Sequence, residues 1–505
     1  MRKLNLCMMV CLQLLVIACS HEEVPDESLR AQVYELSHSK EFENLLIEPS
    51  SGSLDAHDAI CVAQLFMRKE NILSSTRSLF VSKEPLNTLP IYKSDSIVAY
   101  IVNFAGGGFT IVSASKKYSP VLAFSDEGLI YAEDLYSNGL GMWIDAIASD
   151  ISKAEYTILP HTVEYAETRS LWRNYEKQDK VYTLESHVDG NAWDWYLKHR
   201  TQLISETGMS DIRREEFFYL ASTYGASFNS SDFEAIFREK EKWLAVNYST
   251  EPQIPPVFVW GEGTSTKSTE YVRPLLRTYW RQDSPYNNLL PNGQNAGCVC
   301  IAVSQIVNFY QYPSSLDGVP IDWTLTQVEE ASSSDAEVQK LVKIVSEGVE
   351  TTASGGSNIS KAQRFFIRNS YQTQLVANQN SLESEILSEL NSGRPVYIQG
   401  IKPDSSIGHA FVCDGFICDK SFRKILAFEI NELENRSFKE TPYRIFFSAS
   451  KNVHSNSFFH MNWGWGPSFK DEDLPSGSNT IGWFKTIFDT AYNNSMKILK
   501  VSPLR

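Results

Sequence analysis

Cys298 stands at the start of a predicted helix and is the residue of this chain best placed for nucleophilic chemistry. Gly297 and Cys298 come directly before apolar residues that lie three and four positions apart, and Pro313 marks the expected end of the helix. The positive end of a helix dipole favours an anion, and a thiolate is an anion. Most lone cysteines are small buried residues, so this position alone leaves a nucleophile and a core residue as open alternatives.

A thiol that attacks a carbonyl needs a neighbouring base and a group that orients this base. Downstream of the candidate nucleophile the chain has three histidines: His409, His454 and His460. Spacing along the chain does not choose between them, because such partners meet in space. His409 follows Gly408, whose small size lets a backbone or a substrate come close. His460 would share a strand face with Asn462, so the residues alone leave the base undecided.

Five blocks between residues 280 and 466 resemble, in the same order, the motif set of streptopain-like cysteine peptidases: "WRQDSPYNNLLP", "NAGCVCIAVSQIVNFYQYP", "RPVYIQGI", "GHAFVCDGF" and "HMNWGWG". These peptidases have the papain fold with a bacterial elaboration. Further upstream, "FAGGGFTIVSASKKYSPVLAFSDEG" is similar to the propeptide and inhibitor module of the same family. The resemblance implies a cysteine endopeptidase made as a zymogen, with its own prodomain as an intramolecular inhibitor and with proteins or peptides as substrates.

The resemblance also implies a role for each residue that matches its motifs. Cys298 would be the nucleophile and His409 the base. The side-chain amide of Gln282 would help to form the oxyanion hole, together with the backbone amide of Cys298. Asn462 and Trp463 fall where the family orients and shields the catalytic histidine, and which of the two contributes more stays open.

The substrate cleft is predicted in the same way. The segment "SGGSNIS" resembles the Gly/Ser loop that lines the cleft, which implies substrate contacts from Gly355, Gly356 and Ser357 and, beside the base, from Gly408. His460 then becomes a supporting strand residue. Cys300 stands where the family usually has a small residue, and we interpret it as buried.

Two regions depart from the family pattern. The segment from Lys420 to Phe458, between the base and the Asn/Trp block, is unusually long and predicts an extra hairpin or excursion. The helical patterns between Gly141 and Tyr248 have no counterpart in the resemblance. The first region could shape substrate choice or could misplace the Asn/Trp block. The second could extend the propeptide, wedge the cleft or bind a partner.

The first residues predict export. "MRKLNLCMMVCLQLLVIACS" combines a basic start with an apolar run too short for a membrane span, as signal peptides do. Its end, "VIAC", resembles the bacterial lipobox, which implies cleavage after Ala18 and lipidation of Cys19. We therefore expect an exported lipoprotein of the bacterial cell envelope or surface, held on the membrane by its lipid anchor only. A plain secreted protein and release on maturation remain alternatives.

The composition of the chain argues against several classes of partner. The chain has 505 residues and a net charge of −15, which argues against nucleic acid or an anionic membrane surface as the main partner. The cysteines outside the signal lack the paired spacing of a zinc site. We expect no metal and no cofactor.

The segment patterns predict an α+β fold, in which the helix bearing the nucleophile packs on a β-rich half. The resemblance implies that this part is a papain-like catalytic domain, preceded by a small α+β prodomain and a helical insert. In the prodomain, a glycine cluster from Gly106 to Gly108 predicts a hairpin turn. The predicted divisions are a signal peptide (1–18), an inhibitor-like domain (19–140), a helical extension of the proregion (141–250), a linker with the maturation site (251–270) and the peptidase domain (271–505).

The predicted function is therefore a zymogen of a cysteine endopeptidase that works through a thiolate–imidazolium pair and an acyl-enzyme. Two alternatives stay open because a shared fold does not determine the reaction. One is a catalytically inactive relative that acts as an inhibitory or binding lipoprotein. The other is a papain-fold transamidase.

Overall fold

The computed structural model describes residues 47, 53–73, 83–135, 138–159, 162–176, 210–211, 257–401, 408–430, 443–466, 481–485 and 496–504. The predicted signal peptide, Cys19 and most of the predicted helical extension lie outside these ranges, so the corresponding expectations stay predictions. None of the helices within these ranges combines the length and the apolar character that a bilayer span requires.

The N-terminal half is an antiparallel sheet between helices. Its elements are α4 (Ala56–Leu73), β1 (Pro85–Lys93), β2 (Ser96–Phe104), β3 (Phe109–Ser113), β4 (Val121–Ser125), the 3₁₀ turn η2 (Ala132–Leu135), α5 (Asn138–Thr157) and α6 (Val163–Trp172). Alternate residues of β2 face opposite sides of the sheet. Tyr100 and Val102 share a core with α4, whereas Ala99 and Ile101 share a core with α5. A strand covered on both faces explains why β2 is apolar almost without interruption.

The predicted hairpin at Gly106–Gly108 is confirmed, since it joins the antiparallel strands β2 and β3. All three glycines have positive φ, a conformation that other residues rarely adopt. A Cβ on Gly108 would also lie 2.8 Å from the carbonyl oxygen of Ser125. Glycine is therefore required at this turn for conformation and for space.

The predicted boundary at residues 140 and 141 is wrong, because it falls inside α5. The helix packs against the N-terminal sheet with Leu140, Ile147 and Ile151 in the shared core. The chain then continues through α6, and Trp172 is buried against the opposite face. The sheet cannot bury its two faces without these helices, so the N-terminal module in the structure extends to residue 176.

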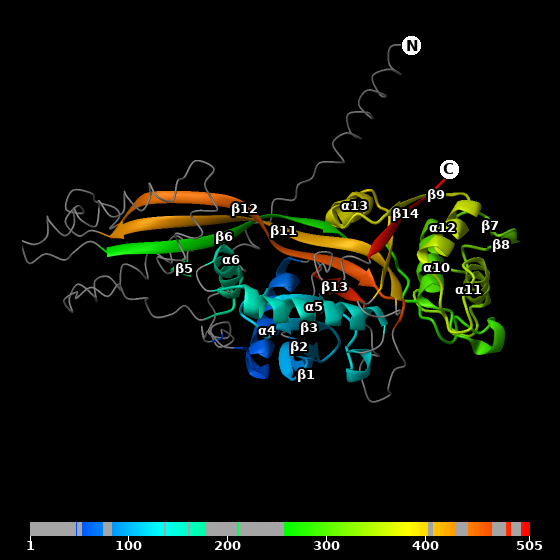
Figure 1. The fold of residues 1–505 in the computed structure, drawn as a ribbon, viewed down its shortest axis with the longest axis horizontal. Helices are drawn as coiled ribbons and strands as arrows, with labels where there is room; N and C mark the ends of the chain where they lie inside the picture. Colours follow the sequence, from blue (N-terminus) through cyan, green and yellow to red (C-terminus); the bar gives the residue numbers. More distant parts are fainter. Residues whose placement is uncertain are drawn as a thin grey trace, which may run out of the picture.

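The C-terminal half combines a helical cluster with long strands. Its elements are β5 (Ser210–Asp211), β6 (Val257–Val272), η3 (Pro291–Gly293), α10 (Cys298–Tyr310), β7 (Ser315–Leu316), β8 (Val319–Pro320), α11 (Ala336–Gly348), α12 (Ile359–Arg368), β9 (Tyr371–Val376), η4 (Gln379–Ser381), α13 (Leu382–Asn391), β10 (Val396–Ile401), β11 (Gly408–Ile430), β12 (Tyr443–Asn462), β13 (Gly482–Phe484) and β14 (Lys497–Pro503). Figure 1 shows α10, α11 and α12 gathered at one end of the sheet. Nearly all of α10 is buried, and it packs against β10 and β11. The predicted α+β class, with the Cys298 helix on a β-rich half, is confirmed.

A single sheet runs through both halves of the molecule. Its strand order is β1-β2-β3-β4-β13-β12-β11-β10-β14-β9. The join is the pairing of β4 with β13, in which Phe124 lies opposite Trp483 and Ala123 lies opposite Phe484. The N-terminal module is therefore attached to the C-terminal half by backbone hydrogen bonds as well as by side chains.

The predicted linker at 251–270 is corrected from residue 257 onward. Residues 257–272 form β6, which pairs with β11 along its length, from Val257 opposite Ile430 to Val272 opposite Phe416. Within the segment from Lys420 to Phe458, residues 420–430 and 443–458 continue β11 and β12 as an extended antiparallel pair, as the alternative of an extra hairpin predicts. These three strands run well beyond the helices of the N-terminal module (Figure 1). Backbone pairing with β11 overrides the Gly/Ser/Thr composition that indicates a linker.

Candidate active site

Cys298 is the first residue of α10, as its sequence pattern predicts. Gly297 caps the helix with φ of 82°. A Cβ at Gly297 would lie only 2.0 Å from the carbonyl oxygen of Gly355, so this position has no room for a side chain. The close approach brings the Gly/Ser loop against the residue that precedes the nucleophile.

The environment of Cys298 favours its thiolate. Burial of the thiol opposes ionisation, whereas the charge of His409 and a hydrogen bond from its ring favour it. Backbone hydrogen bonds from Ala410 and Val299 act in the same direction, so the pKa of Cys298 lies below its ordinary value. By contrast, complete burial raises the pKa of the Cys300 thiol to about 12. Cys300 therefore stays protonated at neutral pH, in line with its predicted buried role.

His409 lies at the start of β11, where it pairs with Gly400 of β10. Its Nε2 is 2.8 Å from the backbone carbonyl oxygen of Trp463. A carbonyl can only accept, so Nε2 carries a proton, and Nδ1 is the ring nitrogen left to face the thiol. The group that orients His409 is thus a backbone carbonyl.

Asn462, the other predicted orienting residue, uses its side-chain amide elsewhere. Its Nδ2 donates to the carbonyl oxygen of Thr278 at 2.7 Å and to Oε1 of Gln305 at 3.0 Å. Its Oδ1 accepts from Nε2 of Gln305 at 3.3 Å and from the backbone N–H of Gly464 at 3.2 Å. Both oxygen lone pairs and both N–H groups are therefore engaged away from His409.

Gln282 is buried close to the nucleophile, and its side-chain amide is unused. Its backbone carbonyl accepts from the N–H of Ala296 at 2.8 Å, which ties it to the segment just before Cys298. Its side chain is 5% exposed, and Nε2 has no hydrogen-bond partner among the described residues. A buried donor without a partner costs free energy, and such a donor is available to a developing oxyanion.

The predicted cleft residues differ in their placement. Gly355 contacts Gly297, and Gly408 is exposed at the start of β11 beside His409. Ser357, however, donates its hydroxyl to the carbonyl oxygen of Val349 at 2.5 Å. The N–H of Gly356 donates to Oγ1 of Thr352 at 2.9 Å. The structure therefore brings Gly355 and Gly408 to the site and engages Ser357 and Gly356 within their own loop.

His460 belongs to a different cluster. Its Nδ1 is 2.6 Å from Oδ1 of Asp414, whose other oxygen accepts from the backbone N–H of Leu276. Asp414 is fully buried. His460 thus supports the strands, as predicted, while the side chain of His454 lies outside what the structure describes. Within the described ranges, no three or more metal-ligating side chains of His, Cys, Asp or Glu come together.

The sequence patterns missed a contact between α5 and this site. A Cβ on Gly139 would lie 2.5 Å from Cδ2 of His409 and 2.5 Å from Cε3 of Trp463. The first turn of α5 therefore rests directly on the histidine ring. The available signal is the pair Gly139 and Gly141 in "SNGLGMW", since glycine is a poor helix former.

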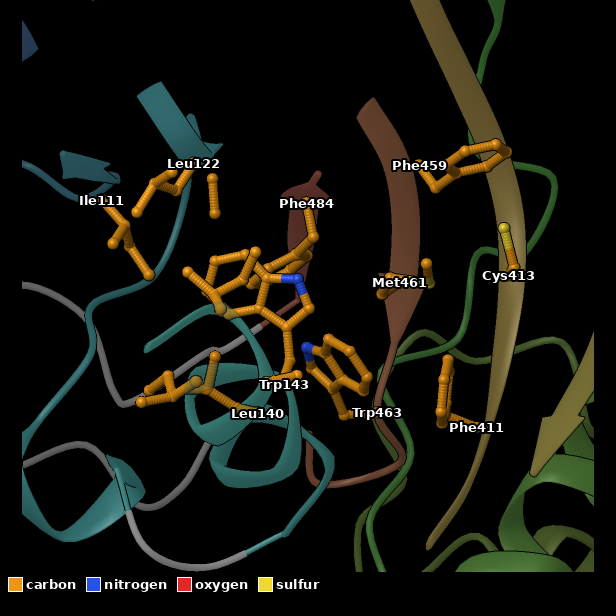
Figure 2. Close-up of a cluster of buried hydrophobic side chains, with 14 of the residues drawn as sticks. Ile111, Leu122, Leu140, Trp143, Phe411, Cys413, Phe459, Met461, Trp463 and Phe484 are labelled. Carbon is orange, nitrogen blue, oxygen red and sulfur yellow. The ribbon is translucent and has the colours of Figure 1, made fainter. Parts of the chain in front are cut away.

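A shared apolar core surrounds this contact. Figure 2 shows Trp143 of α5 beside Trp463 and Phe484, and Leu140 belongs to the same buried cluster. The rings of Trp143 and Phe484 are 5.0 Å apart, and Nε1 of Trp143 donates to the carbonyl oxygen of Lys485 at 2.9 Å. We call the contact of the α5 start and β4 with His409, Trp463 and β13 the seam. The seam packs the N-terminal module against His409 and Trp463 of the C-terminal half.

Comparisons with known proteins match both halves. Residues 51–151 match the family model of the Spi protease inhibitor, and residues 280–346 and 331–471 match the model of the Peptidase C10 family. A curated relative, the thiol protease/hemagglutinin PrtT of Porphyromonas gingivalis, is 29% identical over 208 residues, which cover 34% of this chain and 23% of that protein. The chain thus spans about a quarter of the length of this relative.

Two solved structures from Prevotella intermedia are also similar. A prointerpain A fragment has 14% identity and a TM-score of 0.42, covering 82% of this chain and 98% of its own. Active interpain A cysteine protease has 18% identity and a TM-score of 0.30, covering 45% of this chain and 94% of its own.

Proposed function

Since the chain carries a Peptidase C10 module behind a Spi protease inhibitor-like module, we propose that it is a cysteine endopeptidase made as a zymogen. The observation that carries the proposal is the pairing of Cys298 with His409 at the start of α10. His409 lowers the pKa of the thiol, while Trp463 holds the far side of its ring. Such a pair is suited to hydrolysis of peptide bonds.

In the first half of the reaction, Cys298 Sγ attacks the carbonyl carbon of the scissile peptide bond. The negative charge on the carbonyl oxygen is met by Nε2 of Gln282 and the backbone N–H of Cys298. Each such donor lowers the barrier by about 3 kcal/mol. The Nδ1 proton of His409 passes to the leaving amine as the C–N bond breaks, which leaves an acyl-enzyme on Cys298.

In the second half, water replaces the amine. Neutral His409 takes a proton from water, the hydroxide adds to the acyl carbon, and the C–S bond breaks to release the carboxylic acid. The Trp463 carbonyl stabilises the charged imidazolium and keeps Nδ1 directed at the sulfur. The cycle ends with the thiolate–imidazolium pair restored.

The seam makes the N-terminal module an inhibitor of this site. Gly139 lies against the Cδ2 and Nε2 side of the His409 ring, so the first turn of α5 restricts the position of the base. The pairing of β4 with β13 and the packing of Trp143 hold α5 there. Activation therefore requires the N-terminal module to leave, or at least α5 to withdraw.

We place the maturation cut before Val257. A peptidase needs a segment that is free to extend through its cleft, and residues 257–272 are paired with β11. Residues 251–256 of the predicted maturation region lie outside the described residues and keep the sequence-based prediction. Cleavage inside β6 would first require separation of this strand from β11.

We also propose that the protein is exported and anchored through a lipid on Cys19, because "VIAC" resembles a lipobox. Metabolic labelling with a clickable fatty acid, followed by detergent partitioning, tests this proposal. Label on the wild-type chain and none on Cys19→Ala supports it. Equal labelling of both chains, or none on either, contradicts it.

The test of activity is mass spectrometry of the chain from residue 20, as wild type and as Cys298→Ala, with reducing agent and an unstructured protein substrate. We expect the wild type to shed its N-terminal part and cut the substrate, while Cys298→Ala does neither. A trace of trypsin in parallel tubes separates failed maturation from an inactive site. A wild type that stays inert after trypsin points to the inactive-relative alternative, and new isopeptide bonds instead of new N-termini point to transamidation.

A further inference from the structure

Gln305 is a fully buried side chain that the reaction described above does not use. It lies seven residues after Cys298 on α10, which is about two helical turns and places both residues on the same side of the helix. Its Oε1 accepts from Oγ1 of Thr278 at 2.8 Å. Because Gln305 is fully buried, water cannot replace a lost hydrogen-bond partner of its amide, and each such loss costs free energy.

Gln305 and Asn462 form a reciprocal amide pair. Gln305 Nε2 donates to Oδ1 of Asn462, and Asn462 Nδ2 donates back to Oε1 of Gln305. Two antiparallel hydrogen bonds fix both the distance and the plane of the two amides. The nucleophile helix is thereby bound directly to the end of β12.

Asn462 passes this constraint to the next peptide. Its Oδ1 accepts from the N–H of Gly464, two residues ahead, which closes a small turn around Trp463. Gly464 itself has φ of 73°, a conformation that favours glycine. The turn directs the carbonyl of Trp463 at Nε2 of His409.

We propose that Gln305 is a positioning residue for His409, acting through Asn462 and the carbonyl of Trp463. One rigid helix then carries the nucleophile at its start and the anchor for the orienter of the base two turns later. The inference rests on the proposed peptidase function for its kinetic consequence only. The geometry itself concerns the reactivity of Cys298, which can be measured without a peptide substrate.

The first test compares Gln305→Met with Asn308→Leu in the full chain from residue 20, matured with the same limited amount of trypsin. Methionine keeps the length of glutamine and removes its hydrogen bonds. Asn308 is the matched control because it is a buried amide on the same helix that binds Thr326 and Gln327, away from Asn462. Both variants lose buried hydrogen bonds, but only one should disturb His409.

We expect kcat of Gln305→Met to fall about 10- to 100-fold on a fluorogenic peptide amide, since a base displaced by about 1 Å loses this much. KM should change by less than about threefold, because Gln305 touches no substrate. The alkylation rate of Cys298 by iodoacetamide near pH 6 should fall as well. Asn308→Leu should keep both rates within about threefold at a temperature where it is folded. Equal losses in the two variants, or full rates in Gln305→Met, overturn the proposal.

A double-mutant cycle tests the route through Asn462. If Gln305 acts through Asn462, then Gln305→Met together with Asn462→Ala should lose no more activity than Asn462→Ala alone. Losses that multiply would overturn the proposal. If Gln305→Met does not fold, Thr278→Val tests the proposal in its place. This substitution removes only the hydrogen bond from the Thr278 hydroxyl to Oε1 of Gln305. An unchanged kcat and alkylation rate in Thr278→Val would then reject the role.

The alkylation readout separates this proposal from the proposed function. A wild type that is alkylated rapidly but hydrolyses no peptide would refute the peptidase. In that case, the comparison of Gln305→Met with Asn308→Leu by alkylation still decides the positioning role.

Discussion

The site around His409 and the seam that packs against it are neighbours, but different forces hold them. Directional hydrogen bonds define the site: His409 Nε2 donates to the carbonyl oxygen of Trp463 at 2.8 Å, and Asn462 Nδ2 donates to the carbonyl oxygen of Thr278 at 2.7 Å. The seam is mostly apolar and aromatic, with one side-chain hydrogen bond from Trp143 and a short strand pairing. Hydrogen bonds specify geometry, whereas apolar burial gives affinity with little directional demand. A catalytic site needs the defined geometry of hydrogen bonds. Apolar burial suits an inhibitor that must eventually dissociate.

The largest expected effect contrasts two histidines near the ends of paired strands. His409→Ala removes the base and should lower kcat/KM by about 1,000-fold, with little change in folding stability. His460→Ala leaves the buried Oδ1 of Asp414 without its imidazole partner and should lower the free energy of unfolding by about 1–3 kcal/mol. Kinetics and urea denaturation of both variants measure the contrast. A fully active His409→Ala would refute the assignment of the base.

The second-largest effect is expected from Gln282→Ala. It removes the buried donor Nε2, which has no partner within the described residues. We expect kcat to fall about 100-fold, with KM nearly unchanged and folding stability unchanged or slightly higher. The small structural effect follows because no hydrogen bond to that donor is lost. A large rise in KM with kcat intact would show that Gln282 binds substrate in its ground state instead.

At the seam, Trp143→Ala should speed maturation in trans by a trace of active enzyme. Removing a buried tryptophan costs about 3–5 kcal/mol of packing, part of which holds α5 against Trp463. Trp143→Phe, which keeps one aromatic ring but loses the rest of the indole and its hydrogen bond to Lys485, serves as the graded control. The time course of N-terminal loss by gel and mass spectrometry gives the answer. Slower or unchanged loss in Trp143→Ala would mean that the seam does not limit activation.

Gly139→Ala tests the contact at its narrowest point. The added Cβ would lie 2.5 Å from the His409 ring, so α5 must shift. Such overpacking costs about 1–3 kcal/mol, which weakens the inhibitory contact without touching the mature enzyme. The full-length chain should therefore alkylate Cys298 faster than wild type, while the mature forms behave alike. Slower alkylation of Cys298 would contradict this prediction, because it would mean that Gly139→Ala strengthens the contact of α5 with His409.

The pH dependence of alkylation sharpens the electrostatic side of the site. Because the folded pKa of Cys298 is depressed, its thiolate persists below the pH at which an unfolded cysteine becomes protonated. Its contribution to stability is present above the unfolded pKa and is lost as pH falls through the folded pKa. His409→Ala removes the charge that lowers the pKa, so the midpoint of alkylation in the folded mature chain should move to higher pH. An unmoved midpoint would assign the shift to the backbone hydrogen bonds and the helix terminus.

Sequence patterns correctly predicted the features that depend only on residues close together in the sequence. The helix that begins at Cys298 and the hairpin at Gly106–Gly108 follow from spacing and glycine alone, and both are present. The linker prediction failed from residue 257 onward because small polar residues indicate a loop only when no strand pairs with them. Pairing with β11 comes from residues 144 to 173 positions further along the chain, which no local pattern contains.

By itself, the sequence determined the position of Cys298 at a helix start and, through motif order, the pairing with His409 and the two-module plan. Only the tertiary structure decided that a carbonyl at Trp463 orients His409, while Asn462 braces the turn through Gln305. It alone showed Gly139 on the histidine ring. The reason is physical: every residue except proline carries the same backbone donor and acceptor, and a glycine has no side chain, so neither leaves a chemical signature in the sequence. Their roles arise only when folding brings distant segments together.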